Sequence, residues 1–167
     1  VSWTIVGAST FGNKIDERYN LDGNMASWTD STGVGSTQIT EPSIYVDQGA
    51  SPWSLGMYAR ALLADVDHTL PALPAGTLKV SEGEEIAVEG KPGALTVRAY
   101  ALTGLGLNPS YVLLDKDKAL FAVISSKFIV IRKGYENEEE RLRGIADRLS
   151  TDRFKSIQKA TAHRYDA

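Results

Sequence analysis

The side chains best suited to catalysis and metal binding are scarce in this chain, which has two histidines, His68 and His163, and no cysteine. Zinc and iron sites normally take three or four ligands from histidine, cysteine and carboxylates, and most acid–base and nucleophilic sites use a positioned histidine or thiolate. We therefore assign no catalytic, cofactor-binding or metal-binding residue, and we expect no metalloenzyme site within these residues.

His68 follows Asp67, and such a pair could act as a general base with a carboxylate partner. Adjacent side chains seldom face each other, so we favour a loop residue for His68 and an exposed residue near a helix end for His163. Ser156 and Lys159 have the Ser-x-x-Lys spacing of penicillin-recognising serine enzymes. The Ser-Asp-Asn and Lys-Thr-Gly elements that accompany that spacing are absent, which favours a polar helix face.

Two glycine pairs and one acidic run also have plain interpretations. Gly104-Leu-Gly106 and Gly33-Val-Gly35 each begin a dinucleotide-binding pattern, but its third glycine is missing in both cases. The acidic run at 82–89 could hold a hard cation through carboxylate oxygens. A solvated strand edge, kept charged against pairing with other strands, is the favoured interpretation.

Aromatic residues offer a candidate for ligand binding. Trp3, Trp28 and Tyr45 could line a hydrophobic groove on a curved sheet. Core packing accounts for these side chains at least as well, since tryptophan is largely buried in either case. A ligand groove and a packed core both remain open from the sequence.

The composition is that of an ordinary globular protein. With 167 residues, 43% of them apolar and 23% charged, a single domain over residues 1–167 can bury a substantial core. A net charge of -3 does not provide the basic surface that nucleic-acid binding needs. No segment approaches the roughly 18 apolar residues of a membrane-spanning helix. We therefore expect neither nucleic acid as a partner nor a membrane span.

Short strands are predicted in the N-terminal part of the chain. Residues 1–7 alternate large apolar residues with mostly small or polar ones, the pattern of a strand with one covered face. Turn clusters at 11–14 and 21–24 bracket a second strand, and 25–30 supplies a third. Residues 31–38 are mostly small and polar and predict a flexible loop.

A helix is predicted from Ser51-Pro52 to about Ala64, with the serine hydroxyl as its cap. Its apolar stripe comprises Leu55, Tyr58 and Leu62, with Met57 and Ala61 alongside. Residues 65–77 contain two prolines and one glycine and predict an irregular loop.

The second half predicts strands at 78–80, 85–89, 94–102, 111–114 and 119–125. Residues 119–124 are all apolar, which indicates a central strand covered on both faces. From 135 onward the spacing becomes helical, and a break at 150–152 could begin a second helix with Phe154 and Ile157. The predicted fold class is therefore α+β: a curved antiparallel meander with one mid-chain helix and C-terminal helices.

Several stretches share residues with one known group of proteins. They are the run from Arg98 to Ala122, Ile131-Arg-Lys-Gly-Tyr-Glu136, His163-Arg-Tyr-Asp166, Ser9-Thr-Phe-Gly12 with Asp16-Glu-Arg-Tyr19, and the Ser51-Pro52 helix ending in Ala59-Arg-Ala-Leu-Leu63. This set resembles the N-terminal extension of exported bacterial amidohydrolases of the imidazolonepropionase-like group. The shared residues are packing and turn residues, and the similarity covers most of the chain.

In that group the extension precedes a metal-dependent (β/α)₈ barrel, which hydrolyses amide or related bonds with a metal-activated water. The barrel's His-x-His pair, bridging lysine, later histidines and metal-binding aspartate have no counterpart in these residues. The resemblance thus implies a non-catalytic accessory domain, with further strands before Val1 and the barrel after Ala167. A divalent metal is expected in that barrel and no cofactor in this chain.

The same resemblance implies a periplasmic or secreted protein whose partner is the catalytic barrel of the same polypeptide. A missing strand before Val1 would leave an open sheet edge, through which a homo-oligomer could form.

Two other classes compete with the accessory domain. In the first, the chain is a module that binds lipid or another apolar ligand; a solvent-open pocket lined by Trp3, Trp28 and Tyr45 would favour it, whereas a sheet plugged by the helix at 52–64 would favour the accessory domain. The second is an independent enzyme, which predicts hydrolysis by these residues alone.

Overall fold

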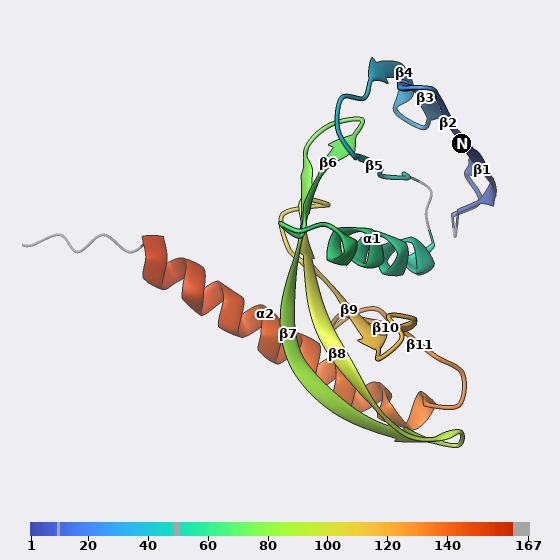
Figure 1. Ribbon diagram of the computed structural model, residues 1–167. Coiled ribbons are helices and arrows are strands. Elements are labelled where there is room, and N and C mark those ends of the chain that lie inside the picture. The colour runs from blue at the N-terminus through green and yellow to red at the C-terminus, as the bar shows by residue number, and fades with distance from the viewer. Residues whose placement is uncertain (10, 49–50, 162–167) are drawn as a thin grey trace, which may run out of the picture. The chain divides into compact units, whose positions relative to one another are not determined.

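The chain has a mixed α+β fold, described by a computed structural model for residues 1–9, 11–48 and 51–161 (Figure 1). The described residues form predominantly antiparallel sheets and two α-helices, which confirms the predicted fold class. Contacts divide the chain into two compact units. Unit 1 comprises Val1–Glu82 and Tyr100–Pro109, and unit 2 comprises Gly83–Ala99 and Ser110–Ala167.

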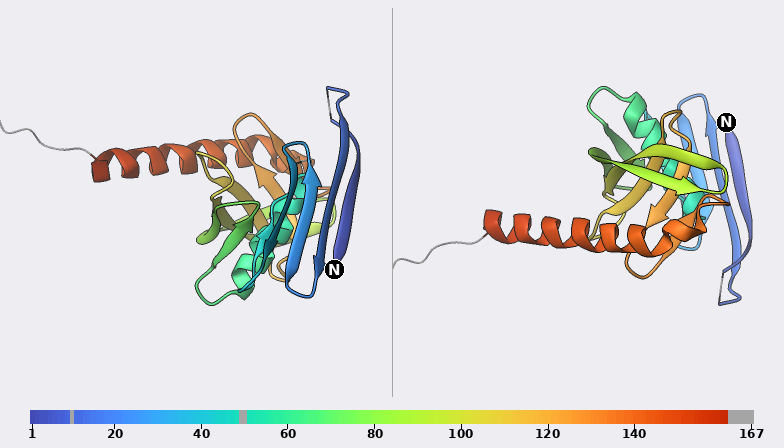
Figure 2. Two further views of the ribbon diagram at one scale, coloured as in Figure 1. Left: turned by 90° about the horizontal axis from the view of Figure 1, so that it is seen from above. Right: turned by 90° about the horizontal axis from the view of Figure 1, so that it is seen from below.

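A four-stranded antiparallel meander in the order β1-β2-β3-β4 forms part of unit 1 (Figure 2). Its strands are β1 (Ser2–Ala8), β2 (Lys14–Asp22), β3 (Met25–Asp30) and β4 (Gly33–Gln38). Trp3 and Ile5 are half-buried between exposed neighbours, so β1 has the predicted single covered face. The predicted loop at 31–38 is wrong, because Gly35 pairs with Trp28 across the sheet and β4 continues the meander.

The rest of unit 1 contains β5 (Ile44–Tyr45), α1 (Pro52–Ala64), β6 (Thr69–Leu73) and the parts of β7 (Thr77–Gly90) and β8 (Gly93–Thr103) that belong to it. β5 and β6 pair in parallel, and β6 pairs with β7 in antiparallel. The predicted irregular loop at 65–77 is therefore partly wrong. Leu70, Ala72 and Leu73 are buried there, and this burial accounts for a strand where proline and glycine suggested a loop.

α1 begins as predicted, with Ser51 as its N-cap residue and Pro52 in the first turn, but the Ser51 hydroxyl makes no capping bond. The helix buries Ser54, Gly56, Tyr58, Ala59 and Leu62. Tyr58 and Leu62 were expected on that face, whereas Met57 and Ala61 are exposed. The buried face is thus rotated toward the small residues, which leaves Ser54 and Tyr58 hydroxyls inside the unit.

Unit 2 holds β9 (Ser110–Asp115), β10 (Leu120–Ile124), β11 (Ile129–Ile131), the 3-10 turn η1 (Glu136–Glu138) and α2 (Glu139–Thr161), with its parts of β7 and β8. Strands β5 to β11 follow one another by hydrogen bonding in the order β11-β10-β9-β8-β7-β6-β5. β10 is buried from Phe121 to Ile124 and has a neighbour on each side, so the predicted central strand is confirmed.

α2 is one continuous helix, and the predicted break at 150–152 is wrong. Leu142 and Ala146 are buried, whereas every described residue from Ser150 onward is exposed. Serine, threonine and aspartate lower helix propensity by only fractions of a kcal/mol, roughly 0.5 each, which a helix already started can absorb. The expectation of a single domain over the chain stays a prediction. Among the described helices, none has the length and apolar character needed to cross a membrane.

Candidate functional site

The three residues predicted to line a groove come together in unit 1. The Tyr45 ring lies 5.4 Å from the Trp3 ring and 6.2 Å from the Trp28 ring, measured between centroids. Tyr19 stacks on Tyr45 at 4.7 Å. β1, β2 and β3 supply Trp3, Tyr19 and Trp28 from one face of the meander, since Trp3 pairs with Tyr19 and Tyr19 with Trp28.

These aromatic side chains pack against one another. Tyr19 and Tyr45 are buried, and together with Ala26 and Leu73 they form a hydrophobic cluster on which Trp3 and Trp28 lie. The Trp28 indole covers Gly35, where a Cβ atom would lie only 2.5 Å from Trp28 Cε2. The Trp28 indole can therefore occupy this position because residue 35 on β4 is a glycine and has no side chain. Whether these residues also bind an apolar ligand stays a prediction.

The Tyr45 hydroxyl lies between two buried carboxyl groups. Its oxygen is 2.8 Å from Glu17 Oε1 on β2 and 3.2 Å from Asp30 Oδ2 at the end of β3. Glu17 is only 2% exposed and also accepts the Gln48 backbone N–H, at 2.9 Å to Oε1 and 3.0 Å to Oε2. Neither carboxyl group was identified from the sequence.

Asp30 closes the β3–β4 turn. Its Oδ1 accepts the Thr32 N–H at 2.7 Å, the Thr32 hydroxyl at 2.6 Å and the Gly33 N–H at 3.2 Å. Burial opposes ionisation of Asp30, but the donors from Thr32, Tyr45 and Gly33 together hold the pKa of this carboxyl below its ordinary value. The turn thus favours the ionised form.

A second buried carboxyl group, Asp47, connects the segment after β5 to α1. It accepts the Tyr58 hydroxyl at 2.7 Å and the Ser54 hydroxyl at 2.9 Å, while its own N–H donates to the Tyr58 oxygen at 3.0 Å. Burial raises the pKa of Asp47, and the negative charge of Glu17 adds to this, whereas the two hydroxyl donors lower it only in part. Burial likewise raises the pKa of Tyr45 and of Tyr58 above the ordinary range of tyrosine, with the adjoining carboxylates adding to it.

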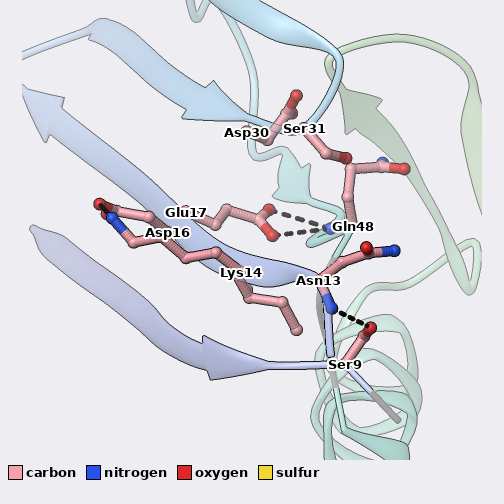
Figure 3. Close-up of a pocket in the computed structure, with 9 residues that line it drawn as sticks. Ser9, Asn13, Lys14, Asp16, Glu17, Asp30, Ser31 and Gln48 are labelled. Carbon is pink, nitrogen blue, oxygen red and sulfur yellow. Dashed lines mark hydrogen bonds and ion pairs between the residues drawn. The ribbon is translucent and has the colours of Figure 1, made fainter. Parts of the chain in front are cut away.

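A cavity of about 330 Å³ adjoins Glu17 and Asp30 (Figure 3). Its lining is formed by Ser9, Asn13, Lys14, Ile15, Asp16, Glu17, Asp30, Ser31 and Gln48. None of the three predicted groove residues belongs to this lining. In Figure 3 the Glu17 side chain reaches toward Gln48, and the Asn13 N–H donates to the Ser9 hydroxyl at 3.2 Å. Most of the residues that line the cavity are polar or charged, and Ile15 is the one apolar residue among them.

The other candidates from the sequence are dispersed. His68 is half-buried at a positive φ of 53°, and Ser156 and Lys159 lie on the exposed part of α2. In the acidic run, Glu84 pairs with Arg148 and Glu85 with Arg98. His163 lies outside the described residues. Within residues 1–9, 11–48 and 51–161, no group of three histidine, cysteine or acidic side chains is placed to hold a metal ion.

The sequence did contain a signal for Glu17. β2 places Ile15, Glu17, Tyr19 and Leu21 on one face by its period of two, so a charged residue on that face is an inward-pointing one. Asp30 had a weaker signal, since aspartate before Ser-Thr-Gly is typical of a turn whose carboxylate accepts backbone N–H groups.

Comparison of the chain with family models, with curated proteins and with solved structures finds no match. Fold and site together define a mixed α+β protein with an aromatic cluster and a buried network of carboxyl and hydroxyl groups in unit 1.

Proposed function

We propose that this chain is a non-catalytic accessory domain of an amidohydrolase-like, metal-dependent hydrolase. The proposal draws on the resemblance of residues 98–122 and the accompanying stretches to the N-terminal extension of that group. In this proposal the divalent metal and the catalytic side chains belong to the barrel, and the protein is periplasmic or secreted. The role of the accessory domain is to cover or position the barrel.

The packing of the aromatic residues supports this proposal over a ligand carrier. Trp3 and Trp28 pack on the buried cluster that contains Tyr45, and the Tyr45 hydroxyl contacts Glu17 and Asp30. A groove for an apolar ligand needs apolar side chains with solvent or ligand on one side. The cavity beside Glu17 is not lined by Trp3, Trp28 or Tyr45.

The test compares the complete gene product with two pieces of it. We expect a barrel with a His-x-His pair after Ala167, metal-dependent hydrolysis by the complete protein, and no hydrolysis by residues 1–167. Deleting residues 1–167 should lower the thermal stability of the barrel, because its covered surface becomes exposed. Melting temperature, bound metal and turnover are measured on all three proteins.

Two results would contradict the proposal. Hydrolysis by residues 1–167 alone would make the chain an enzyme. A saturable change of tryptophan fluorescence on titration with oleate, at one ligand per chain, would instead favour the lipid-binding alternative.

A further inference from the structure

The outer edge of β7 carries no strand along its part in unit 2. β6 pairs with Thr77–Lys79, and among the described residues no other strand lies on that side of β7. Successive residues of a strand point their backbone groups to opposite edges. Val88 points its N–H and carbonyl toward β8, whereas Ala87 and Glu89 point theirs outward. Outward groups of this kind are a template for pairing with another chain.

Side chains of η1 and the first turn of α2 bond to these outward groups. The Glu89 N–H donates to Glu138 Oε1 at 2.9 Å, and the Glu89 carbonyl accepts the Asn137 side chain at 2.8 Å. Two residues away, the Ala87 carbonyl accepts the Arg141 guanidinium, whose Nε donates to Glu138 Oε2 at 2.7 Å. A neighbouring antiparallel strand would offer its donors and acceptors at the same alternate residues. The three side chains thus stand where a strand would pair.

The backbone before η1 lies equally close to the turn between β7 and β8. The Lys91 N–H donates to the Gly134 carbonyl at 2.9 Å. A Cβ atom on Gly90 would collide with that carbonyl and would lie 2.6 Å from Tyr135 Cδ1, so the approach requires a glycine. The Tyr135 side chain is buried, and its ring meets the Phe121 ring edge-on at 5.0 Å between centroids. The segment is therefore anchored among buried residues of unit 2 where it meets the hairpin.

We propose that residues 134–141 act as a strand plug: they occupy the outer edge of β7 in place of a neighbouring strand and keep it from pairing with a strand of a second copy of this chain. A real strand at this place would itself present a new open edge, whereas side chains from a helix end the sheet. Further along β7, Glu84 pairs with Arg148 of α2, so the helix stays beside the same strand. The plug is independent of the proposed role as an accessory domain.

Amide hydrogen exchange tests whether the plug covers the strand edge. Asn137→Ala combined with Glu138→Ala removes the two side chains that bond to Glu89. The Glu89 N–H should then exchange at least about tenfold faster than in the parent protein. The Val88 N–H is the internal reference, because it faces β8 and should keep its rate. Glu139→Ala is the matched control, since Glu139 adjoins Glu138 but forms its ion pair within α2.

Sedimentation velocity tests whether the opened edge pairs with a second copy. All proteins in this comparison carry Val6→Lys, whose exposed charge opposes pairing at the edge of β1. We expect the protein with Asn137→Ala and Glu138→Ala to dimerise at least about tenfold more tightly than its parent, because the outward groups of β7 then offer a strand template. The Glu139→Ala control should behave like the parent. Equal association of that control would assign the effect to a disturbed helix start and contradict the plug.

An unchanged exchange rate of the Glu89 N–H overturns the proposal, and so does faster exchange without association. If the Val88 N–H exchanges as fast as that of Glu89, the double variant has unfolded in unit 2, and Gly90→Ala decides. Its methyl group displaces the Gly134 carbonyl without a positive φ and without loss of any plug side chain. Gly90→Ala should accelerate exchange of the Lys91 N–H and cause the same association, and the absence of either result contradicts the proposal.

Discussion

Asp47 shows how a single buried carboxyl group can lower stability at neutral pH. Burial raises the pKa of Asp47 in the folded protein, so the folded state binds this proton more tightly than the unfolded state does. Stability therefore falls as the pH rises from the unfolded value of about 3.9 to the raised folded value, and it stays lower above that. Asp30 has the opposite sign, because its lowered pKa adds stability that is lost as the pH falls.

We expect Asp47→Asn to raise the free energy of unfolding at neutral pH by roughly 0.5–2 kcal/mol, the range of single stabilising substitutions. The amide can accept the Tyr58 hydroxyl and donate to the Ser54 oxygen without burying a charge. Urea unfolding at about pH 7 and about pH 4 measures the effect, which should shrink at the lower pH. Asp22→Asn, at an exposed carboxylate, is the control. Destabilisation by Asp47→Asn at neutral pH would contradict this account.

At the same scale, the sequence predicted which aromatic residues meet but not what they meet. The rings of Trp3 and Trp28, on one face of the meander, lie close to the Tyr45 ring, which comes from β5, and a ligand groove at these residues stays a prediction. Their polar partners were missed, although the period of two in β2 places Glu17 on the same face as Tyr19. That Tyr45 on β5 contacts Glu17 depends on tertiary packing, which the period does not predict. Asp47 and Tyr58 meet through a segment without periodicity, and no sequence pattern predicts such a contact.

Among the elements, α2 changes from a buried to an exposed helix along its length. Leu142 is fully buried in unit 2, whereas Phe154 is 61% exposed. We expect Leu142→Ala to cost about 2–5 kcal/mol, because it leaves a cavity in packed surroundings. Phe154→Ala should stay within about 0.5 kcal/mol. Thermal and urea unfolding measure both variants, and comparable losses at the two positions would show that the distal half of α2 is packed in solution.

Element types followed from the sequence wherever one pattern was strong. The strand at 119–124, the helix from 52 and the helical pattern from 135 onward are examples, although α2 itself begins at Glu139 after the short η1. The prediction from the sequence failed at 31–38, because glycine and serine gave no strand signal there. Pairing with β3 makes this segment a strand. It failed again at 150–152, where weak helix formers do not interrupt a helix that is already established.

For the whole molecule, the proposal of a homo-oligomer concerns the outer edge of β1, which has β2 as its one strand neighbour among the described residues. We expect concentration-dependent dimers in light scattering, formed by strand pairing at this edge. Val6→Lys should shift the dimer toward monomer, because an exposed charge on an edge strand opposes such pairing. Val34→Lys on β4, at the opposite edge of the same sheet, is the matched control. Dissociation by Val34→Lys alone would assign the contact to β4 instead.

The composition of unit 1 has a consequence for biosynthesis. Its residues do not form one continuous stretch, because Tyr100–Pro109 return to it after residues 83–99 have contributed to unit 2. A nascent chain that has emerged from the ribosome only as far as residue 99 therefore still lacks part of unit 1, although it already contains the meander and α1. Translation must proceed past Pro109 before unit 1 can be completed on the ribosome. In a chain shortened before that point, the surface that Tyr100–Pro109 normally cover would be exposed to solvent or bound by a chaperone.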